Sequence, residues 1–337
     1  MKKVVTLGEI MLRLSTQAGE RLSQANQLMM HYGGGEANVG VSLSHFGYDV
    51  YFVSKIPNNP LGLGVKRHLQ SHGVHTEYLV TGGERLGTYY LETGIGERSA
   101  KVTYDRKYSS FSKLLVEELD FDEIFKDAAL FHLSGITPAL SARLQEVALI
   151  ALQKAKEHGV MTSFDCNYRA SLWSHQEAAE AFQSLLPYVD ICFCGELDAI
   201  YLLGIEQAPD TLTREEKLVF YYKKIKEIYP NIHYMSSTFR DVHSASSNDL
   251  QGTLFVDGSL YVSEKHAINP IADRVGGGDA FAAGILYGLL ETLSPQSSVS
   301  FAAAASALKH TIYGDCNTFT FEEVFQFAEN GSGKILR

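Results

Sequence analysis

The stretch that decides the fold reads Asp273-Arg274-Val275-Gly276-Gly277-Gly278-Asp279-Ala280-Phe281-Ala282-Ala283-Gly284. Its three consecutive glycines run directly into a helical pattern, and the N-terminus of a helix offers free N–H groups and a partial positive charge that suit a phosphate. Glycine also lets the backbone approach a ligand closely. Asp279 follows at the same helix mouth, where it is placed to take a proton from a hydroxyl that attacks the phosphate. The alternative is a flexible turn in which Asp279 only caps the helix.

A second glycine turn, Gly33-Gly34-Gly35-Glu36-Ala37-Asn38, opens another helical pattern. The backbone around Gly34 could lie against a polyol whose hydroxyls Asn38 recognises. A tight turn with an N-terminal cap is the alternative interpretation.

A third group combines tyrosines with arginines: Tyr89, Tyr104, Arg106, Asn167 and Arg169. Tyr104 and Arg106 are two positions apart on an expected strand and therefore share one face. Arg169 follows a strand end, which is where open α/β sheets bind ligands. Guanidinium groups can hold a carboxylate by paired hydrogen bonds, although each arginine could equally form an ordinary surface ion pair.

Hydrophobic patterning around these motifs predicts alternating strands and helices, which is typical of parallel strands covered by helices. Strands are expected at 4–7, 49–54, 130–133, 161–165 and 190–194, hairpins at 88–108 and 253–261, a polar loop at 244–248, and helices at 36–46, 63–71, 141–158, 178–186, 212–228, 280–292 and 299–312. Gly47, Gly73 and Gly159 are expected to end three of the helices.

Length and net charge restrict the classes of protein to which the chain can belong. The 337 residues allow about two domains, or one large α/β domain with an appendage. The formal net charge of −10 argues against a general nucleic-acid binder or a protein that binds anionic membranes. An anionic substrate must therefore be held by a few placed arginines or by backbone N–H groups.

Other features exclude further classes. The four cysteines form no CxxC pair, which favours a reduced, cytoplasmic protein without disulfides. The apolar run near Met1 is too short for a signal peptide, and no run approaches the ~18 apolar residues of a membrane span. Neither a GxxxxGK[ST] sequence nor a GxGxxG after the first strand occurs, which weakens a Walker-type NTPase and a dinucleotide-binding oxidoreductase.

Together, the two glycine stretches, Gly8-Glu9 after the first strand and the tyrosine-rich insert resemble the ribokinase-like (PfkB) carbohydrate kinases over essentially the whole chain. Within that family the chain is most similar to the 2-keto-3-deoxygluconate kinases. The discriminating stretches are Gly87-Thr88-Tyr89-Tyr90, Tyr104-Asp105-Arg106, Asp165-Cys166-Asn167-Tyr168-Arg169, and Leu308-Lys309-His310-Thr311 leading to Gly314-Asp315.

The resemblance implies one carbohydrate-kinase domain over 1–337 with a three-layer α/β/α fold. The central sheet would be mostly parallel, and segments within about 11–32 and 86–110 would build a small β-sheet lid over the sugar. The implied reaction is ATP-dependent phosphorylation of 2-keto-3-deoxygluconate at its terminal C6 hydroxyl, giving 2-keto-3-deoxy-6-phosphogluconate.

The same resemblance implies roles for individual residues. Asp279 would be the general base, and Gly276, Gly277 and Gly278 the anion hole. The sugar-acid pocket would be lined by Gly34, Asn38, Tyr89, Tyr104, Arg106, Asn167 and Arg169. Thr238 and Arg240, at the end of a strand, would lie by the ATP phosphates, and Ala303 and Ser306 would border the adenine.

Three departures from the family pattern qualify these roles. Arg274 and Val275 replace two hydroxyl residues, which puts the usual monovalent-cation site in doubt. The Asn-x-x-Glu motif linked to Mg²⁺ reads Gly195-Glu196-Leu197-Asp198, so Glu196 and Asp198 are expected to reach Mg²⁺ only indirectly. The usual lysine of the nucleotide loop is missing, and Arg240 is expected to supply its charge.

Alternatives remain at this stage. They are another PfkB sugar kinase of the fructokinase or ribokinase type, a sugar-binding regulator without catalysis, and a Rossmann oxidoreductase. The expected partners are a small sugar acid and ATP, with no nucleic acid and no membrane. A homo-oligomer is expected through the free edges of the β lid.

Overall fold

Alternating side chains along the strands determine how the molecule is layered. In β1 (Lys3–Leu7), Val4 packs into one hydrophobic core and Val5 into another. Leu130 and Phe131 of β8 (Ala128–Ser134) are divided in the same way. Because successive strand residues point to opposite faces, the sheet is buried on both sides and needs a layer of helices on each.

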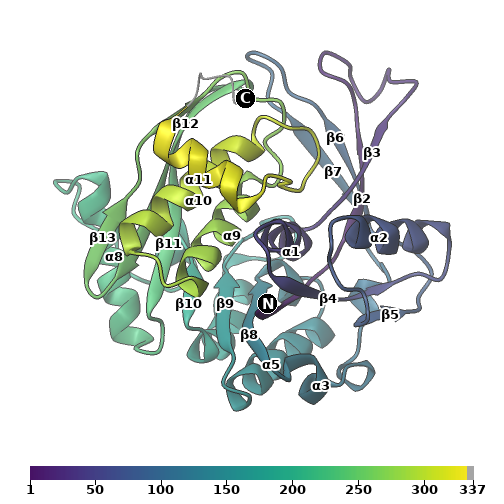
Figure 1. Cartoon of the computed structure of the whole chain (residues 1–337), viewed down its shortest axis with the longest axis horizontal. Helices are drawn as coiled ribbons and strands as arrows, with labels where there is room; N and C mark the ends of the chain where they lie inside the picture. Colours follow the sequence, from purple (N-terminus) through teal and green to yellow (C-terminus); the bar gives the residue numbers. More distant parts are fainter. Residues whose placement is uncertain (332–337) are drawn as a thin grey trace.

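The computed structural model of the chain describes residues 1–331 and shows this arrangement (Figure 1). The central sheet has ten strands in the order β13-β12-β11-β10-β9-β8-β1-β4-β5, with β14 paired to β12. Neighbours are parallel from β5 to β11 and antiparallel beyond β11, which confirms the mostly parallel α/β fold. The remaining strands are β4 (Asp49–Ile56), β5 (Leu79–Thr81), β9 (Met161–Asp165), β10 (Ile191–Phe193), β11 (Tyr234–Ser244), β12 (Ser247–Val256), β13 (Ser259–Val262) and β14 (His266–Ile268).

Two helical layers cover the sheet. The core that contains Val4 also holds buried residues of α1 (Gly35–His45), α2 (Pro60–Ser71), α9 (Gly277–Leu290), α10 (Pro295–Lys309) and α11 (Phe321–Asn330). The other core holds residues of α3 (Phe121–Phe125), α5 (Ala142–Glu157), α6 (His175–Leu185), α7 (Glu196–Tyr201) and α8 (Arg214–Ile228). As expected, Gly47, Gly73 and Gly159 take positive φ angles just after α1, α2 and α5.

A separate four-stranded sheet, in the order β3-β2-β6-β7, rises beside the main body at the upper right of Figure 1. Its strands are β2 (Met11–Ser15), β3 (Met29–Gly33), β6 (Thr88–Glu92) and β7 (Lys101–Asp105). Three expectations stay predictions: this sheet acts as a lid, it joins subunits, and residues 1–337 form one domain. Residues 332–337 lie outside the described part.

Two expectations about the nucleotide side are wrong. The stretch 244–248 is no loose loop but the tight turn between β11 and β12, because Arg274 donates hydrogen bonds to the carbonyls of Ser244, Ala245 and Ser247. Thr238 and Arg240 are not at a strand end, because pairing with β12 carries β11 on to Ser244. Within residues 1–331, no helix combines the length and hydrophobicity that a bilayer crossing requires.

Candidate active site

A cavity of about 380 Å³ opens where the carboxyl ends of β1, β8 and β9 face the small sheet and the start of α9. Residues after all three strands line it: Glu9, Ile136 and Asn167. Of the predicted site residues, the cavity gathers Gly34, Asn38, Tyr89, Tyr104, Arg106, Asn167, Arg169, Arg240, Gly276, Gly278 and Asp279. Residues from six separate parts of the chain therefore meet at one point, as expected for the ligand site of an open α/β sheet.

The N-terminus of α9 is shaped for an anion. Gly276 has φ +82, and a Cβ there would lie 1.7 Å from the carbonyl oxygen of Asp315, so only glycine fits. A Cβ on Gly277 would meet the ring of His310 at 2.4 Å, whereas Gly278 faces open space. The N–H of Gly277 donates to the Arg274 carbonyl at 3.3 Å, but those of Gly276 and Gly278 have no protein acceptor within the described chain. These two free amides suit the oxygens of a phosphate.

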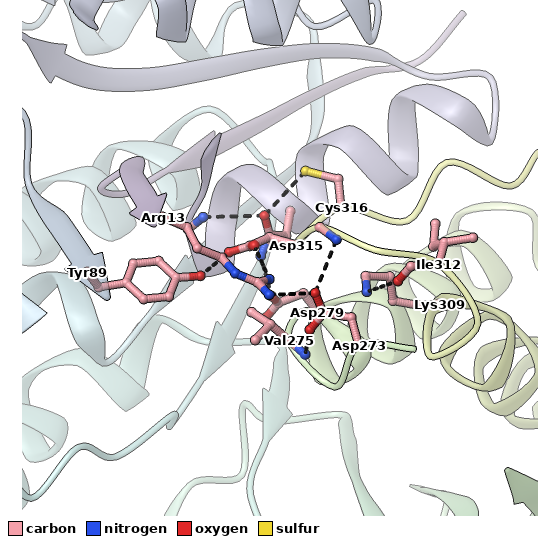
Figure 2. Close-up of polar contacts among 12 residues, drawn as sticks. Arg13, Tyr89, Asp273, Val275, Asp279, Lys309, Ile312, Asp315 and Cys316 are labelled. Atoms are coloured by element: carbon pink, nitrogen blue, oxygen red, sulfur yellow. Dashed lines mark hydrogen bonds and ion pairs between the residues drawn. The ribbon is translucent and has the colours of Figure 1, made fainter. Parts of the chain in front are cut away.

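Asp279 sits one residue further on and faces the same cavity (Figure 2). Its Oδ2 accepts a hydrogen bond of 2.7 Å from Nδ2 of Asn38, whose Oδ1 in turn accepts one of 3.3 Å from the N–H of Gly34. Burial raises the pKa of Asp279 to about 6, against the opposing effects of Asn38 and Arg169. Such a carboxylate is ionised at neutral pH and still able to accept a proton, as a general base requires.

A second carboxylate, Asp165, lies near Asp279, and Asp198 in turn lies near Asp165. Asp165, at the end of β9, accepts a hydrogen bond from the N–H of Asn167, and burial together with the charges of Asp279 and Asp198 raises its pKa to about 8. Burial likewise raises the pKa of Asp198 to about 6, although its Oδ2 accepts from the N–H of Gly195. Glu196 instead accepts a hydrogen bond from the hydroxyl of Tyr221 at 3.4 Å.

These carboxylates form no ready-made metal site. Within residues 1–331, no group of three or more His, Cys, Asp or Glu side chains is close enough to hold a metal ion. The charge of Asp198 nevertheless acts on Asp165, so these two carboxylates are neighbours. Two carboxylates without a third protein ligand suit only a metal ion that keeps most of its waters, as Mg²⁺ usually does.

The two predicted arginines have different environments. Arg106 is buried, donates from Nε and Nη2 to Oε2 of Glu9, and lies 5.7 Å from the centre of the Tyr104 ring. Arg169 is exposed and bonds only the carbonyls of Asn167 and Tyr168. In the part of the chain described, no carboxylate lies within the 4.0 Å of an ion pair with Arg169, although its charge acts on nearby aspartates such as Asp279. Arg169 is therefore free to donate to a substrate carboxylate.

Tyr89 belongs to a buried network of hydrogen bonds and ion pairs that the sequence analysis did not predict. Its hydroxyl donates to Asp315, so this polar group is already engaged (Figure 2). Arg13 donates to Oδ1 of Asp315 at 2.8 Å and to Oδ2 of Asp273 at 2.6 Å. The signal in the sequence is Arg13 itself, a single charge in the apolar strand Met11–Ser15, because such a charge is rarely buried without a partner.

The predicted nucleotide residues divide into two pairs. Arg240 lines the cavity, and its buried Nε has no hydrogen-bond partner in residues 1–331. Thr238 lies on the same strand and is partly buried. Ala303 and Ser306 are fully buried, and the Ser306 hydroxyl donates to the carbonyl of Gly277. The structure thus places Ser306 behind the anion-binding turn, and the contact of this second pair with adenine stays a prediction.

Comparison with known proteins identifies relatives along the whole length. The pattern of the pfkB family carbohydrate kinases matches residues 1–320. A 2-dehydro-3-deoxygalactonokinase from Haloferax volcanii is 35% identical over 335 residues, covering 99% of either chain. A 2-dehydro-3-deoxygluconokinase from Bacillus subtilis is 28% identical over 92% of this chain and 90% of its own. The crystal structure of 2-dehydro-3-deoxygluconokinase from Thermotoga maritima superposes with a TM-score of 0.94 at 41% identity, over 98% of this chain and all of that one.

Proposed function

We propose that this chain, which belongs to the pfkB family of carbohydrate kinases, transfers the γ-phosphoryl group of ATP to the C6 hydroxyl of 2-keto-3-deoxygluconate. The product would be 2-keto-3-deoxy-6-phosphogluconate. The observation that carries the proposal is the meeting, in one cavity, of the Asp279 carboxylate, the free amides of Gly276 and Gly278, and the unpaired Arg169. The first three groups suit phosphoryl transfer to an alcohol, and the fourth suits an acidic sugar.

In the proposed mechanism, Asp279 accepts the proton of the C6 hydroxyl as its oxygen attacks the γ-phosphorus. The bond from that phosphorus to the bridging oxygen of ATP breaks, and ADP leaves. Phosphoryl transfer leaves the protein mainly the tasks of alignment and charge stabilisation. Each glycine amide that faces the transferring group would stabilise its charge as an oxyanion-hole donor does, by roughly 3 kcal/mol.

Nucleotide and metal would bind beside this centre. Arg240, with its unpartnered Nε, would hold an ATP phosphate, and Thr238 lies on the same strand. Mg²⁺ bound to ATP would neutralise phosphate charge there, and Asp165 and Asp198 would hold it through water. Glu196, which accepts a hydrogen bond from Tyr221, would contribute only its negative charge.

On the sugar side, Arg169 would bind the carboxylate of the keto acid. Gly34 and Asn38 would contact its hydroxyls, and Tyr104 with Asn167 would line the rest of the pocket. Arg106 would add positive charge close to the carboxylate while keeping its bond to Glu9.

The galactonate epimer is the second candidate substrate. The Haloferax volcanii relative, at 35% identity, is named for the galactonate compound, whereas the Bacillus subtilis and Thermotoga maritima relatives are named for the gluconate compound. The two substrates differ at one stereocentre, and the groups that line the pocket would contact several hydroxyls of either one.

The test is a coupled assay of ADP release with both keto-deoxy acids, with fructose and with ribose. We expect the highest kcat/KM with 2-keto-3-deoxygluconate and a large preference for acids over neutral sugars. A higher kcat/KM for the galactonate epimer would correct the substrate but keep the reaction. A preference for fructose or ribose, or no ADP release with any sugar, would overturn the proposal.

A further inference from the structure

Lys309 is a buried cation that the proposed mechanism does not use. It is the last residue of α10, and its side chain is fully buried. Its Nζ reaches one acceptor in the described chain, the carbonyl of Ile312 at 3.4 Å, although an ammonium has three donors (Figure 2). Its Cε lies 3.3 Å from where a Cβ on Gly276 would be, so the side chain packs directly behind the anion-binding turn.

The charges around Lys309 explain its position. Burial lowers its pKa, but the carboxylates of Asp273 and Asp315 oppose that shift and favour the charged form. Both carboxylates already bind Arg13. Within residues 1–331, Lys309 forms no ion pair of 4.0 Å or less with either carboxylate, so it acts on them through its charge at a longer distance. With Lys309 in its charged form, two cations balance these two anions, and its removal would leave a net negative charge beneath a turn that must accept phosphate.

With Lys309 in place, the same region neither needs nor readily holds an exchangeable cation. Arg274 and Val275 bring no hydroxyl oxygen, and the guanidinium of Arg274 is committed to carbonyls of the β11–β12 turn. Asp273 is also committed, because its oxygens accept from the N–H groups of Val275 and Gly314 as well as from Arg13.

We propose that Lys309 is a built-in monovalent cation, which neutralises Asp273 and Asp315 behind the anion-binding turn and makes the kinase independent of added K⁺ or Na⁺. This inference rests on the proposed function, because it assigns Lys309 a role in orienting that turn for phosphate. Lys309 is a positioning residue, since it acts through Gly276 and touches no substrate.

The test compares the wild type with Lys309→Met, and with Lys66→Met as a control because Lys66 is exposed on α2. Turnover and KM for ATP are measured in KCl, NaCl and tetramethylammonium chloride at equal ionic strength, because salt screens charge. We expect the wild type and Lys66→Met to work equally well in all three salts. Lys309→Met should lose roughly 10- to 100-fold in kcat/KM for ATP in tetramethylammonium, as expected for a lost charged contact, and recover part of it in KCl.

A second measurement does not depend on turnover. The thermal unfolding temperature of ligand-free Lys309→Met should be higher in KCl than in tetramethylammonium chloride, whereas that of the wild type should not change. The inference is overturned if the wild type loses most of its activity without K⁺ and Na⁺. It is also overturned if Lys309→Met is as active as the wild type, or is impaired equally in every salt, because the side chain would then only fill space. If the wild type phosphorylates no sugar, the proposed function fails, and unfolding and ATP calorimetry in the three salts still decide the role of Lys309.

Discussion

Asn38 donates a hydrogen bond of 2.7 Å from its side-chain amide to Oδ2 of Asp279, across a sequence separation of 241 positions. The bond joins the first turn of α1 to the first turn of α9. It engages Oδ2 and leaves Oδ1 to face Gly35 and the cavity. The hydrogen bond therefore orients the Asp279 carboxylate and leaves one of its oxygens free to accept a proton.

Replacement of Asp279 should lower the rate of phosphoryl transfer without weakening substrate binding. Asp279→Asn keeps the shape and a partner for Asn38 but cannot accept a proton. We expect kcat to fall by about 10²–10⁴-fold, the usual worth of general-base catalysis, with little change in KM for the sugar acid. Steady-state kinetics would check this, with Asp210→Asn, a fully exposed aspartate, as the control. Near-normal turnover of Asp279→Asn would refute its role.

The pH dependence should follow the same carboxylate. Burial raises the pKa of Asp279 to about 6, so below that pH the group is protonated and cannot act as a base. We expect kcat/KM to decline as the pH falls through about 6 and this acid limb to be missing from the residual activity of Asp279→Asn. An acid limb that persists in the variant would assign the titration to another group.

The two pocket arginines should differ on substitution. Arg169→Ala removes an exposed, unpaired guanidinium, so KM for the keto acid should rise roughly 10- to 100-fold without loss of stability. Arg106→Ala should raise the same KM and also lower the unfolding temperature, because it leaves the carboxylate of Glu9 buried without its partner. Kinetics with the keto acid and with fructose, together with thermal melts, measure both effects. Equal losses on both substrates would exclude a carboxylate contact.

Asp165 should make stability depend on pH. Burial and its acidic neighbours raise its pKa to about 8, well above the ordinary value of an aspartate. The folded state therefore binds a proton that the unfolded state releases, and unfolding free energy should decrease as the pH rises from about 4 to about 8. Asp165→Asn should reduce this decrease and be more stable than the wild type at pH 8. Urea titrations at several pH values test this, and parallel curves for the two proteins would contradict it.

Arg13 should matter for stability far more than a surface arginine. Arg13→Met would leave Asp273 and Asp315 buried without their guanidinium, which typically costs about 3–5 kcal/mol. Arg214→Met is the matched control, because its ion pair with Asp241 is exposed and worth about 1 kcal/mol at most. Urea denaturation of both variants measures the difference in unfolding free energy. Equal losses in the two variants would mean that the buried network stabilises the protein no more than a surface ion pair does.

Much of the framework follows from sequence, because helices and strands depend on local pattern. The strand expected at 161–165 matches β9 to the residue, and the glycines after α1, α2 and α5 marked helix ends, since positive φ favours glycine. The glycine turns at Gly34 and Gly276 likewise indicated two helix mouths. Local pattern was insufficient at Thr238 and Arg240, because how far β11 extends depends on its partner strand and on Arg274 from another part of the chain.

By itself, the sequence predicted most of the alternating strands and helices and the two glycine turns at the helix N-termini, and it singled out Asp279 as a candidate base. Only the tertiary structure decided which charges meet: Arg13 with Asp273 and Asp315, Arg106 with Glu9, and Lys309 behind Gly276. The physical reason is that burying a charge requires a partner at hydrogen-bond distance. The folded sheet, not spacing along the chain, brings residues separated by 302 positions, as Arg13 and Asp315 are, within 2.8 Å of each other.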